Sequence, residues 1–348
     1  MEVVVTGAGG LVGATAADYY CRAGAGVVAI ENGTRQRLLG KDGNTWENLE
    51  LLRRRHRQLR IERLDVRSAK AAKLAAQAEL VIHCAAQVSH PRSIEIPQED
   101  ADININGTLN LLEAMRRAGR TNVPFIFCST NKVYGDAPNE LPYEEGETRY
   151  TLPRHPHGID ETLRVDRTLH TPFGCSKLAA DIYAQEYGRL YGLQTGVFRM
   201  SCITGPFSRA TVHQNWIAYF LLCNLTGRPL TIYGWKGKQV RDNIDARDLV
   251  EAFDHFARRP RPGEVYNMGG ERDNAVSCLE VLERSMQLTG QRTGWSPGPT
   301  REGDHRVYIT DMGKFRGHYP QWNKRIGLDQ IVDDLLGWVK STLNSAAA

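Results

Sequence analysis

The chain has 348 residues, 41% of them hydrophobic, which is enough to bury the core of one large α/β unit or of two lobes. Its net charge of +4 is small, and no aromatic residues interleave the basic run Arg53–Arg57, so we expect a solvated helix face and no nucleic-acid partner. No apolar run approaches the roughly 18 residues of a membrane span, and a strand expected from Glu2 leaves no room for a signal peptide. The seven cysteines show no C-x-x-C spacing, which argues against zinc and against a disulfide framework and favours reduced thiols in the cytoplasm.

Short apolar runs rich in β-branched and aromatic residues alternate with helical patterns along the first 200 residues. The runs are 2–7, 26–32, 59–66, 78–86, 123–130 and 194–201. Their βαβ spacing predicts parallel strands buried on both faces, and hence a doubly wound α/β sheet of the Rossmann type. Helices fit between the strands, for example over 102–119, where Ile105, Leu109, Leu112 and Met115 would form the apolar stripe.

Two insertions and a change of pattern predict the domain organisation. Residues 33–58 are polar and basic, and residues 136–170 are rich in proline, so we expect the latter to form an irregular cover over the carboxyl edge of the sheet. After residue 200 the alternation gives way to helices and short strands. We therefore expect a cofactor-binding domain over 1–200 and a smaller substrate-binding lobe over 201–348, with 240–262 returning to the first domain.

The stretch "VVVTGAGGLVG" carries the first indication of function. It places Gly7, Gly10 and Gly13 between the first strand and the first helix, with Leu11 and Val12 in the first helical turn. Glycines allow a sharp turn and a close approach of the backbone to a pyrophosphate, and the helix N-terminus offers free N–H groups and a positive dipole end. The spacing predicts a dinucleotide site.

Glu31 closes the second strand 18 residues beyond Gly13. A carboxylate there accepts hydrogen bonds from both ribose hydroxyls and repels a 2′-phosphate, which favours NAD over NADP; the alternative is a glycine turn followed by a solvent-facing glutamate. Asp65, after the third strand, could meet the adenine edge or be an ordinary strand-end aspartate. The further residues expected around the cofactor are Asn32, Val66, Ala85, Ala86 and Gln87.

Together with "NKVYG" and "FGCSK", these motifs resemble the extended short-chain dehydrogenase/reductase family, specifically its nucleotide-sugar epimerases and dehydratases. The likeness runs over nearly the whole chain and includes "GTLNLLEA", "GPFSRATVHQNW", "GKQVRDNIDARDLV" and "GEVYNMGG". The segments "STNKVYGD", "TWENLELL" and "GKQVRD" are most similar to the CDP-tyvelose (CDP-paratose) 2-epimerase group. The resemblance implies NAD as cofactor, transient hydride abstraction from a nucleotide-linked sugar, and a homodimer.

The resemblance also implies roles for individual residues. Thr130 would hydrogen-bond the reacting sugar hydroxyl, Lys177 would hold the nicotinamide ribose, and Asn104 would support the helix around that lysine. Arg241 would clamp the nucleotide diphosphate, which a fork of donors suits, and Arg306 would do likewise. The other residues expected to bind the substrate are Ser89, His90, Gln214 and Trp216.

Two departures from the family pattern affect the residues expected to move protons. Phe173 stands where the family has the tyrosine of Tyr-x-x-x-Lys. The Asp-Glu pair of the 4,6-dehydratases is replaced by Asn131 and Lys132. An amide cannot take a proton, and a lysine does not protonate a leaving hydroxyl unless burial lowers its pKa, so ordinary 4,6-dehydration is disfavoured.

Several groups could replace the missing phenol. Cys175 is two residues from Phe173 and so lies about 200° around the helix, which excludes it. Thr130 could relay the proton to Lys177, to water or to a substrate phosphate. Cys202 could supply a thiolate if cations lower its pKa, or could be a small buried hydrophobe. The functional alternatives are therefore an epimerase/dehydratase with an atypical site, an unusual dehydratase of a sugar or nucleoside, and a catalytically silent NAD-binding protein.

Overall fold

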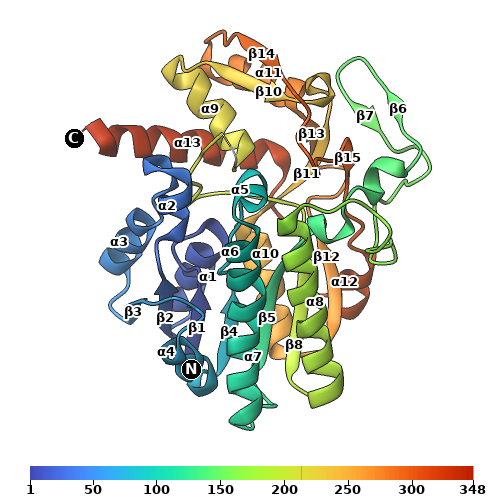
Figure 1. Ribbon diagram of the computed structural model, residues 1–348. Coiled ribbons are helices and arrows are strands. Elements are labelled where there is room, and N and C mark those ends of the chain that lie inside the picture. The colour runs from blue at the N-terminus through green and yellow to red at the C-terminus, as the bar shows by residue number, and fades with distance from the viewer. Residues whose placement is uncertain (213, 348) are drawn as a thin grey trace.

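A computed structural model describes residues 1–212 and 214–347, and its centre is a seven-stranded parallel sheet with the order β3-β2-β1-β4-β5-β8-β12 (Figure 1). The strands are β1 (Glu2–Thr6), β2 (Gly26–Glu31), β3 (Leu59–Arg63), β4 (Leu80–His83), β5 (Pro124–Thr130), β8 (Gln194–Met200) and β12 (Glu264–Met268). The strands expected from the sequence are confirmed, and so is the doubly wound parallel architecture. The order reverses between β1 and β4, which is where such sheets open a crevice for ligands.

The burial of the strands follows their place in the sheet. Val3, Val4 and Val5 of the central strand β1 are completely buried. The prediction that every strand is buried on both faces is wrong for β3, where only Leu59 is buried. This strand is at the edge of the sheet and pairs with β2 alone, so its other side is open to solvent.

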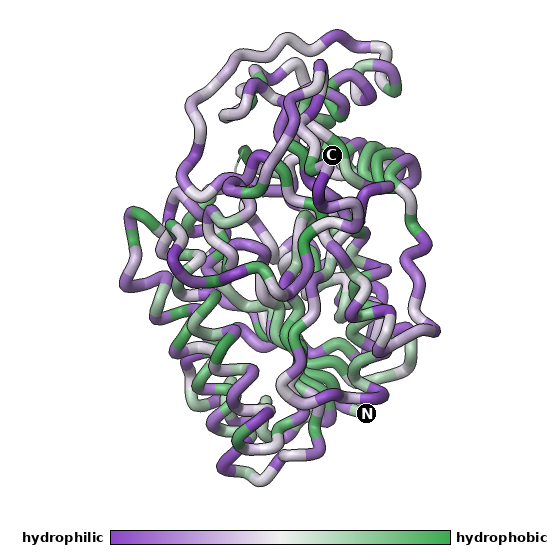
Figure 2. Tube along the Cα trace, turned by 90° about the vertical axis from the view of Figure 1, so that its right-hand side faces the viewer, coloured by the Kyte–Doolittle hydropathy of each residue, from purple (hydrophilic) through white to green (hydrophobic). Residues whose placement is uncertain are grey.

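Helices cover both faces of the sheet. One face carries α1 (Leu11–Arg22) and α10 (Ala246–Arg258), which pack against each other, and α12 (Gly313–His318). The other carries α4 (Ala69–Gln77), α7 (Gly107–Arg117) and α8 (Pro172–Tyr191). The two faces thus build two hydrophobic clusters. Figure 2 shows the hydrophobic stretches gathered along the interior strands and the hydrophilic ones along the outer loops.

The apolar stripe expected on the helix after β4 is confirmed for Leu112 and Met115, which are completely buried, but not for its first half. The chain runs through α5 (His90–Glu95), α6 (Pro97–Ala101) and the π-turn η2 (Asp102–Asn106) before α7 begins. Ile105 and Leu109 are only half-buried, whereas Asn104 is buried. In this first half the buried positions are taken by Gly107, in close contact with Val66, and by the hydrogen-bonded Asn104, which a hydrophobic pattern does not register.

The two insertions take different forms. Residues 33–58 fold into α2 (Thr34–Leu39), η1 (Lys41–Gly43) and α3 (Trp46–Arg55). The basic run at the end of α3 is mostly exposed, as expected of a solvated helix face. Residues 136–170 are largely irregular and contain only η4 (Ala137–Glu140), β6 (Glu144–Glu145) and β7 (Tyr150–Thr151).

Most of the chain after residue 200 lies beyond the carboxyl edge of the main sheet, at the top of Figure 1. It comprises β9 (Cys202–Thr204), α9 (Trp216–Thr226), β10 (Leu230–Tyr233), η5 (Trp235–Gly237), β11 (Val240–Asp245), β13 (Ala275–Ser277), α11 (Cys278–Thr289), β14 (Trp295–Gly298), β15 (Val307–Tyr308) and α13 (Leu328–Ala347). β12 and α12 return to the main sheet and its covering layer, so the sheet is completed by a strand from beyond residue 200. Within 1–212 and 214–347, no helix has the length and apolar character that a membrane span requires.

Candidate functional site

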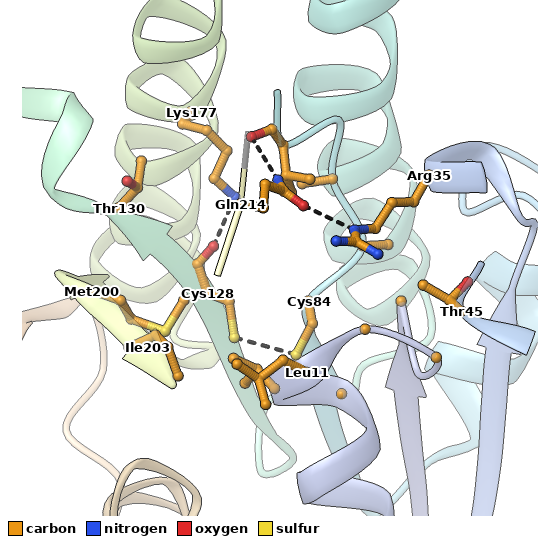
Figure 3. A pocket seen from close by; sticks show the side chains of 18 of the residues that line it. Leu11, Arg35, Thr45, Cys84, Cys128, Thr130, Lys177, Met200, Ile203 and Gln214 are labelled. Atoms are coloured by element: carbon orange, nitrogen blue, oxygen red, sulfur yellow. Dashed lines mark hydrogen bonds between the residues drawn. The ribbon is translucent and has the colours of Figure 1, made fainter. Parts of the chain in front are cut away.

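A cavity of about 420 Å³ opens at the carboxyl ends of the central strands, between the sheet and the residues after 200 (Figure 3). It is lined by ten of the residues expected around the cofactor: Gly7, Gly10, Leu11, Val12, Gly13, Glu31, Asn32, Val66, Ala85 and Ala86. It is also lined by the six residues expected near the chemistry: Thr130, Asn131, Lys132, Phe173, Lys177 and Cys202. The expected substrate residues on its wall are His90, Gln214, Trp216 and Arg241.

The glycine loop is built for close contact. Gly7 has φ +63°, a conformation that favours glycine, and a side chain at Gly13 would clash with the Gly7 carbonyl. Gly9, which the sequence analysis did not single out, lies so near residue 45 that an added Cβ would be 2.7 Å from the Thr45 oxygen. No side chain caps the N-terminus of α1, so its first N–H groups are available to an anion.

Glu31 is bound to the chain rather than facing solvent. Its carboxylate accepts hydrogen bonds from the backbone N–H groups of Gly9 at 3.1 Å, Asn32 at 3.0 Å and Gly33 at 2.9 Å, and the residue is only 7% exposed. A carboxylate has about four acceptor positions. Glu31 therefore fixes the glycine loop and retains acceptor capacity toward the cavity.

Five expected site residues are not on the cavity wall. Asp65 binds Arg67 and accepts from Asn32, and these hydrogen bonds hold the pKa of Asp65 down at about 2. Gln87 donates to Asp100, and Ser89 caps α5. Asn104 donates to Ser176 of α8 at 2.9 Å and accepts from the Gln87 N–H. Arg306 stacks between two aromatic rings, those of Tyr143 and Trp235.

Lys177 is in the cavity wall one helical turn after Phe173 on α8. Its Nζ donates to the Cys128 carbonyl at 2.7 Å and is 4.1 Å from the centroid of the Phe127 ring. Burial lowers the pKa of Lys177 to about 8. One carbonyl holds the amine in place, which leaves its other N–H groups free to meet a ligand.

The ring of Phe173 is presented by the first turn of α8. Thr171 caps this helix by accepting the N–H of Gly174, and Phe173 is 6% exposed. Its ring centroid is 4.7 Å from that of His90. Cys175 is exposed, which agrees with the prediction from helical spacing that it cannot replace the missing phenol.

A cluster of charges contributes Lys132 and Arg241 to the cavity wall. Arg241 of β11 is paired with Asp304 at 2.5 Å, and the Lys132 Nζ donates to the Gly303 carbonyl at 2.8 Å and is 3.9 Å from Asp304. Burial lowers the pKa of Lys132 to about 8. Burial raises the pKa of Asp304, but Arg241 and Lys132 together hold it below its usual range. Two cations therefore share one carboxylate, which leaves positive charge for an anionic group.

The cysteines around the cavity are thiols. Burial raises the pKa of Cys202 to about 11, although Arg241 and Lys132 act in the opposite direction. This direction is opposite to the one that a thiolate at Cys202 requires. Cys84 and Cys128 lie with their sulfur atoms 3.4 Å apart, next to Leu11 in Figure 3.

Two arginines on the cavity wall were missed. Arg35 donates to Gln214 at 2.8 Å, and Gln214 donates onward to the Val88 carbonyl at 3.0 Å. Arg209 binds Glu47 and Asn48. These contacts join the first insertion to residues 205–216. The polar composition of both segments was visible in the sequence, but nothing there indicated that they meet.

The residues present fit a dinucleotide of the NAD type. A glycine cradle that a Cβ would fill faces uncapped helical N–H groups, an acidic side chain closes the second strand, and a buried lysine stands further along the wall. Among residues 1–212 and 214–347, no group of three His, Cys, Asp or Glu side chains is arranged to hold a metal ion.

Comparison with known proteins places the chain in a family. Residues 3–269 match the model of the NAD dependent epimerase/dehydratase family. The chain is 38% identical over 266 residues to CDP-paratose 2-epimerase from Salmonella typhi, covering 74% of this chain and 77% of that protein. It is 30% identical to dTDP-glucose 4,6-dehydratase from Salmonella typhimurium, covering 78% and 76%. The crystal structure of UDP-glucose 4-epimerase from Thermus thermophilus in complex with NAD aligns with a TM-score of 0.75 and 25% identity, covering 98% and 99%.

The chain therefore belongs to the NAD-dependent epimerase/dehydratase family, as the sequence resemblance predicted. It is an enzyme of this class, and its cofactor is NAD.

Proposed function

We propose that this enzyme oxidises a nucleotide-linked sugar transiently and then completes an epimerisation or a dehydration, with no net consumption of NAD. One observation carries the proposal. A single cavity joins the glycine loop and Glu31 at one end, Lys177 and Thr130 in the middle, and Arg241 with Lys132 at the other end.

The cofactor end would hold NAD through the backbone N–H groups of the first turn of α1 and through Glu31. Bound there, NAD supplies the hydride acceptor. Lys177 would donate to the nicotinamide ribose hydroxyls from a position fixed by the Cys128 carbonyl. The carboxylate of Glu31 would disfavour the 2′-phosphate of NADP by charge repulsion.

The middle of the cavity would hold the reacting carbon of the sugar. Thr130 ends β5; its hydroxyl accepts the N–H of Lys132 at 3.2 Å and donates to the Asn131 oxygen over a long 3.5 Å, a contact that it would exchange for one to the sugar. Phe173, one helical turn before Lys177, has no hydroxyl and so offers no proton there. The site would therefore oxidise the sugar without the usual phenol. We expect either a low turnover rate or a different product after the oxidation step.

The far end would bind the diphosphate of a nucleotide sugar. Arg241 and Lys132 present donors there, and an arriving diphosphate would compete with Asp304 for them. The similarity to a CDP-sugar 2-epimerase favours a CDP-linked sugar and epimerisation. The similarity to a 4,6-dehydratase and the missing phenol keep elimination of water as the second candidate.

A mass-spectrometric screen of nucleotide sugars in D₂O tests the function. Epimerisation changes the mass only by incorporated deuterium, whereas dehydration removes one water. We expect turnover of at least one nucleotide sugar, and Lys177→Ala should abolish it while the fold is retained. Absence of any turnover with NAD bound would instead indicate the catalytically silent NAD-binding protein.

A homodimer is the assembly that we propose. The outer face of α8 exposes Ile182, Tyr183, Leu190 and Tyr191, an apolar set on one long helix. Leu190→Asp should convert the dimer to a monomer in analytical ultracentrifugation, whereas Leu169→Asp, another exposed leucine outside this helix, should not. A wild-type monomer would contradict the proposal.

We also propose a cytoplasmic location. All seven cysteines are free, and they include the close pair Cys84 and Cys128, which fits a reducing compartment. Fractionation of cells that express the chain would test this.

A further inference from the structure

The nearest aromatic neighbour of Phe173 in the cavity is a histidine. His90 begins α5, which follows β4 after the connecting residues 84–89, and its ring packs against Phe173 with centroids 4.7 Å apart and planes at 56°. Both rings line the cavity that also holds Thr130 and Lys177. A group able to carry a proton therefore stands beside the ring that has none.

The imidazole is oriented by the same helix that presents Phe173. The Thr171 hydroxyl is 3.5 Å from the His90 Nδ1 and also accepts the N–H of Gly174. A hydroxyl oxygen has two acceptor positions, so Thr171 also accepts the Nδ1–H of His90 in the neutral tautomer that leaves Nε2 unprotonated. Among the described residues, Nε2 has no hydrogen-bond partner, so this nitrogen is the one left for a substrate.

The other candidates are engaged or unsuited. Lys177 is bonded to the Cys128 carbonyl, and Lys132 is bonded to the Gly303 carbonyl beside Asp304. The thiol of Cys202 is neutral. The hydroxyl of Thr130 is too weakly acidic to be deprotonated near neutral pH, so it cannot serve as a base by itself. Of these side chains, only that of His90 combines a free acceptor atom with contact to Phe173.

We propose that His90 takes the proton from the reacting sugar hydroxyl and returns it, in place of the phenol that Phe173 lacks. The inference rests on the proposed function. As the sugar C–H bond breaks, its electron pair leaves as hydride to NAD, and the electrons of the O–H bond become the second bond of the ketone. The proton moves to Nε2, and Thr130 keeps its hydrogen bond to the oxygen. The reverse transfer closes the cycle.

The charges around His90 keep it neutral in the free enzyme. Burial, with Lys132 and Arg301 nearby, lowers the pKa of His90 to about 3, while Asp304 acts in the opposite direction. The free imidazole is therefore neutral but only a weak base. A bound diphosphate would offset the two cations, so the pKa of His90 should rise when the substrate that needs a base is present.

The test uses the full-length enzyme loaded with NAD and the nucleotide sugar found by the screen. His90→Phe should lower kcat by about 10²-fold or more while KM stays within about threefold, because only proton transfer is lost. Adding Phe173→Tyr to that variant should recover activity, since a phenol then stands beside Lys177. His157→Phe, an exposed histidine outside the cavity, serves as the control and should match the wild type.

A binding readout accompanies the kinetics. In NMR titrations, the imidazole signal that His90→Phe removes should show a higher pKa with saturating CDP than without it. A His90→Phe enzyme with kcat within threefold of wild type would overturn the proposal, as would a loss that Phe173→Tyr does not rescue, or a pKa that CDP leaves unchanged. If the wild type turns over no nucleotide sugar, the proposed function fails first and the role of His90 with it.

Discussion

At the scale of single residues, Glu31 decides between two nearly identical cofactors. Its carboxylate is held by three backbone N–H groups, so its negative charge stays at the end of β2. Glu31→Ala should narrow the preference for NAD over NADP by about tenfold, or roughly 1.4 kcal/mol, because the repulsion of the 2′-phosphate is removed. Calorimetric titration with both cofactors measures this. Tighter binding of NADP by the wild type would contradict it.

The hydroxyl of Thr130 is expected to stabilise the reacting oxygen. Thr130→Val keeps the shape of the side chain and removes the donor, so kcat should fall by about 10²-fold. Thr226→Val, an exposed threonine at the end of α9, is the matched control and should leave kcat unchanged. Near-normal turnover by Thr130→Val would show that the hydroxyl is dispensable.

Phe173→Tyr asks whether the missing phenol directs the product. An added hydroxyl near Lys177 would be acidified and would stand at the ketone oxygen of the oxidised sugar. It would assist hydride return and shift the product toward the epimer or the starting sugar. Analysis of the products by NMR shows whether this shift occurs. A faster enzyme with an unchanged product would show that Phe173 has no directing role.

At the scale of secondary-structure elements, Asn104 links the turn before α7 to α8. It joins the Gln87 backbone to Ser176, one residue before Lys177. Asn104→Ala leaves the buried Gln87 N–H without its acceptor and removes a donor to Ser176, which keeps its bond to Asp100, and it should reduce the free energy of unfolding by about 1–3 kcal/mol. Asn106→Ala, on the exposed side of the same turn, should change it by less than about 0.5 kcal/mol. Urea denaturation compares the two, and equal losses would contradict this role.

The positions of the strands were predictable, but the inward face of the segment that ends in α7 was predictable only in part. Strands carry their signal in runs of valine, isoleucine and phenylalanine. Leu112 and Met115 are buried as their spacing predicted, whereas the buried positions before them are Gly107 and Asn104, a small and a polar residue, which a hydrophobic pattern does not weigh. Close backbone approach and buried hydrogen bonds depend on partners distant in the sequence.

At the scale of the whole molecule, Gln214 joins the part of the chain after residue 200 to the cofactor side of the cavity. It accepts from Arg35 (Figure 3) and donates to the Val88 carbonyl, and both partners belong to the first 200 residues. Gln214→Ala should speed NAD release by about tenfold, since a charge-assisted hydrogen bond is worth about 1.5–3 kcal/mol and part of it is regained from water. Gln287→Ala, an exposed glutamine on α11, should release NAD like the wild type. Stopped-flow dilution measures the rates, and equal rates would contradict the bridge.

The sequence by itself determined the parallel sheet, the glycine loop, Glu31, the family, and the replacement of tyrosine by Phe173, because each depends on local pattern or on a motif of fixed spacing. Tertiary structure alone decided that His90 lies against Phe173, that Asp304 is shared by Arg241 and Lys132, and that Arg35 meets Gln214. It also decided that burial, rather than nearby cations, sets the protonation state of Cys202. These contacts join residues far apart in the chain, such as Arg35 and Gln214 with a separation of 179, and protonation depends on depth and on neighbours that only the folded chain supplies.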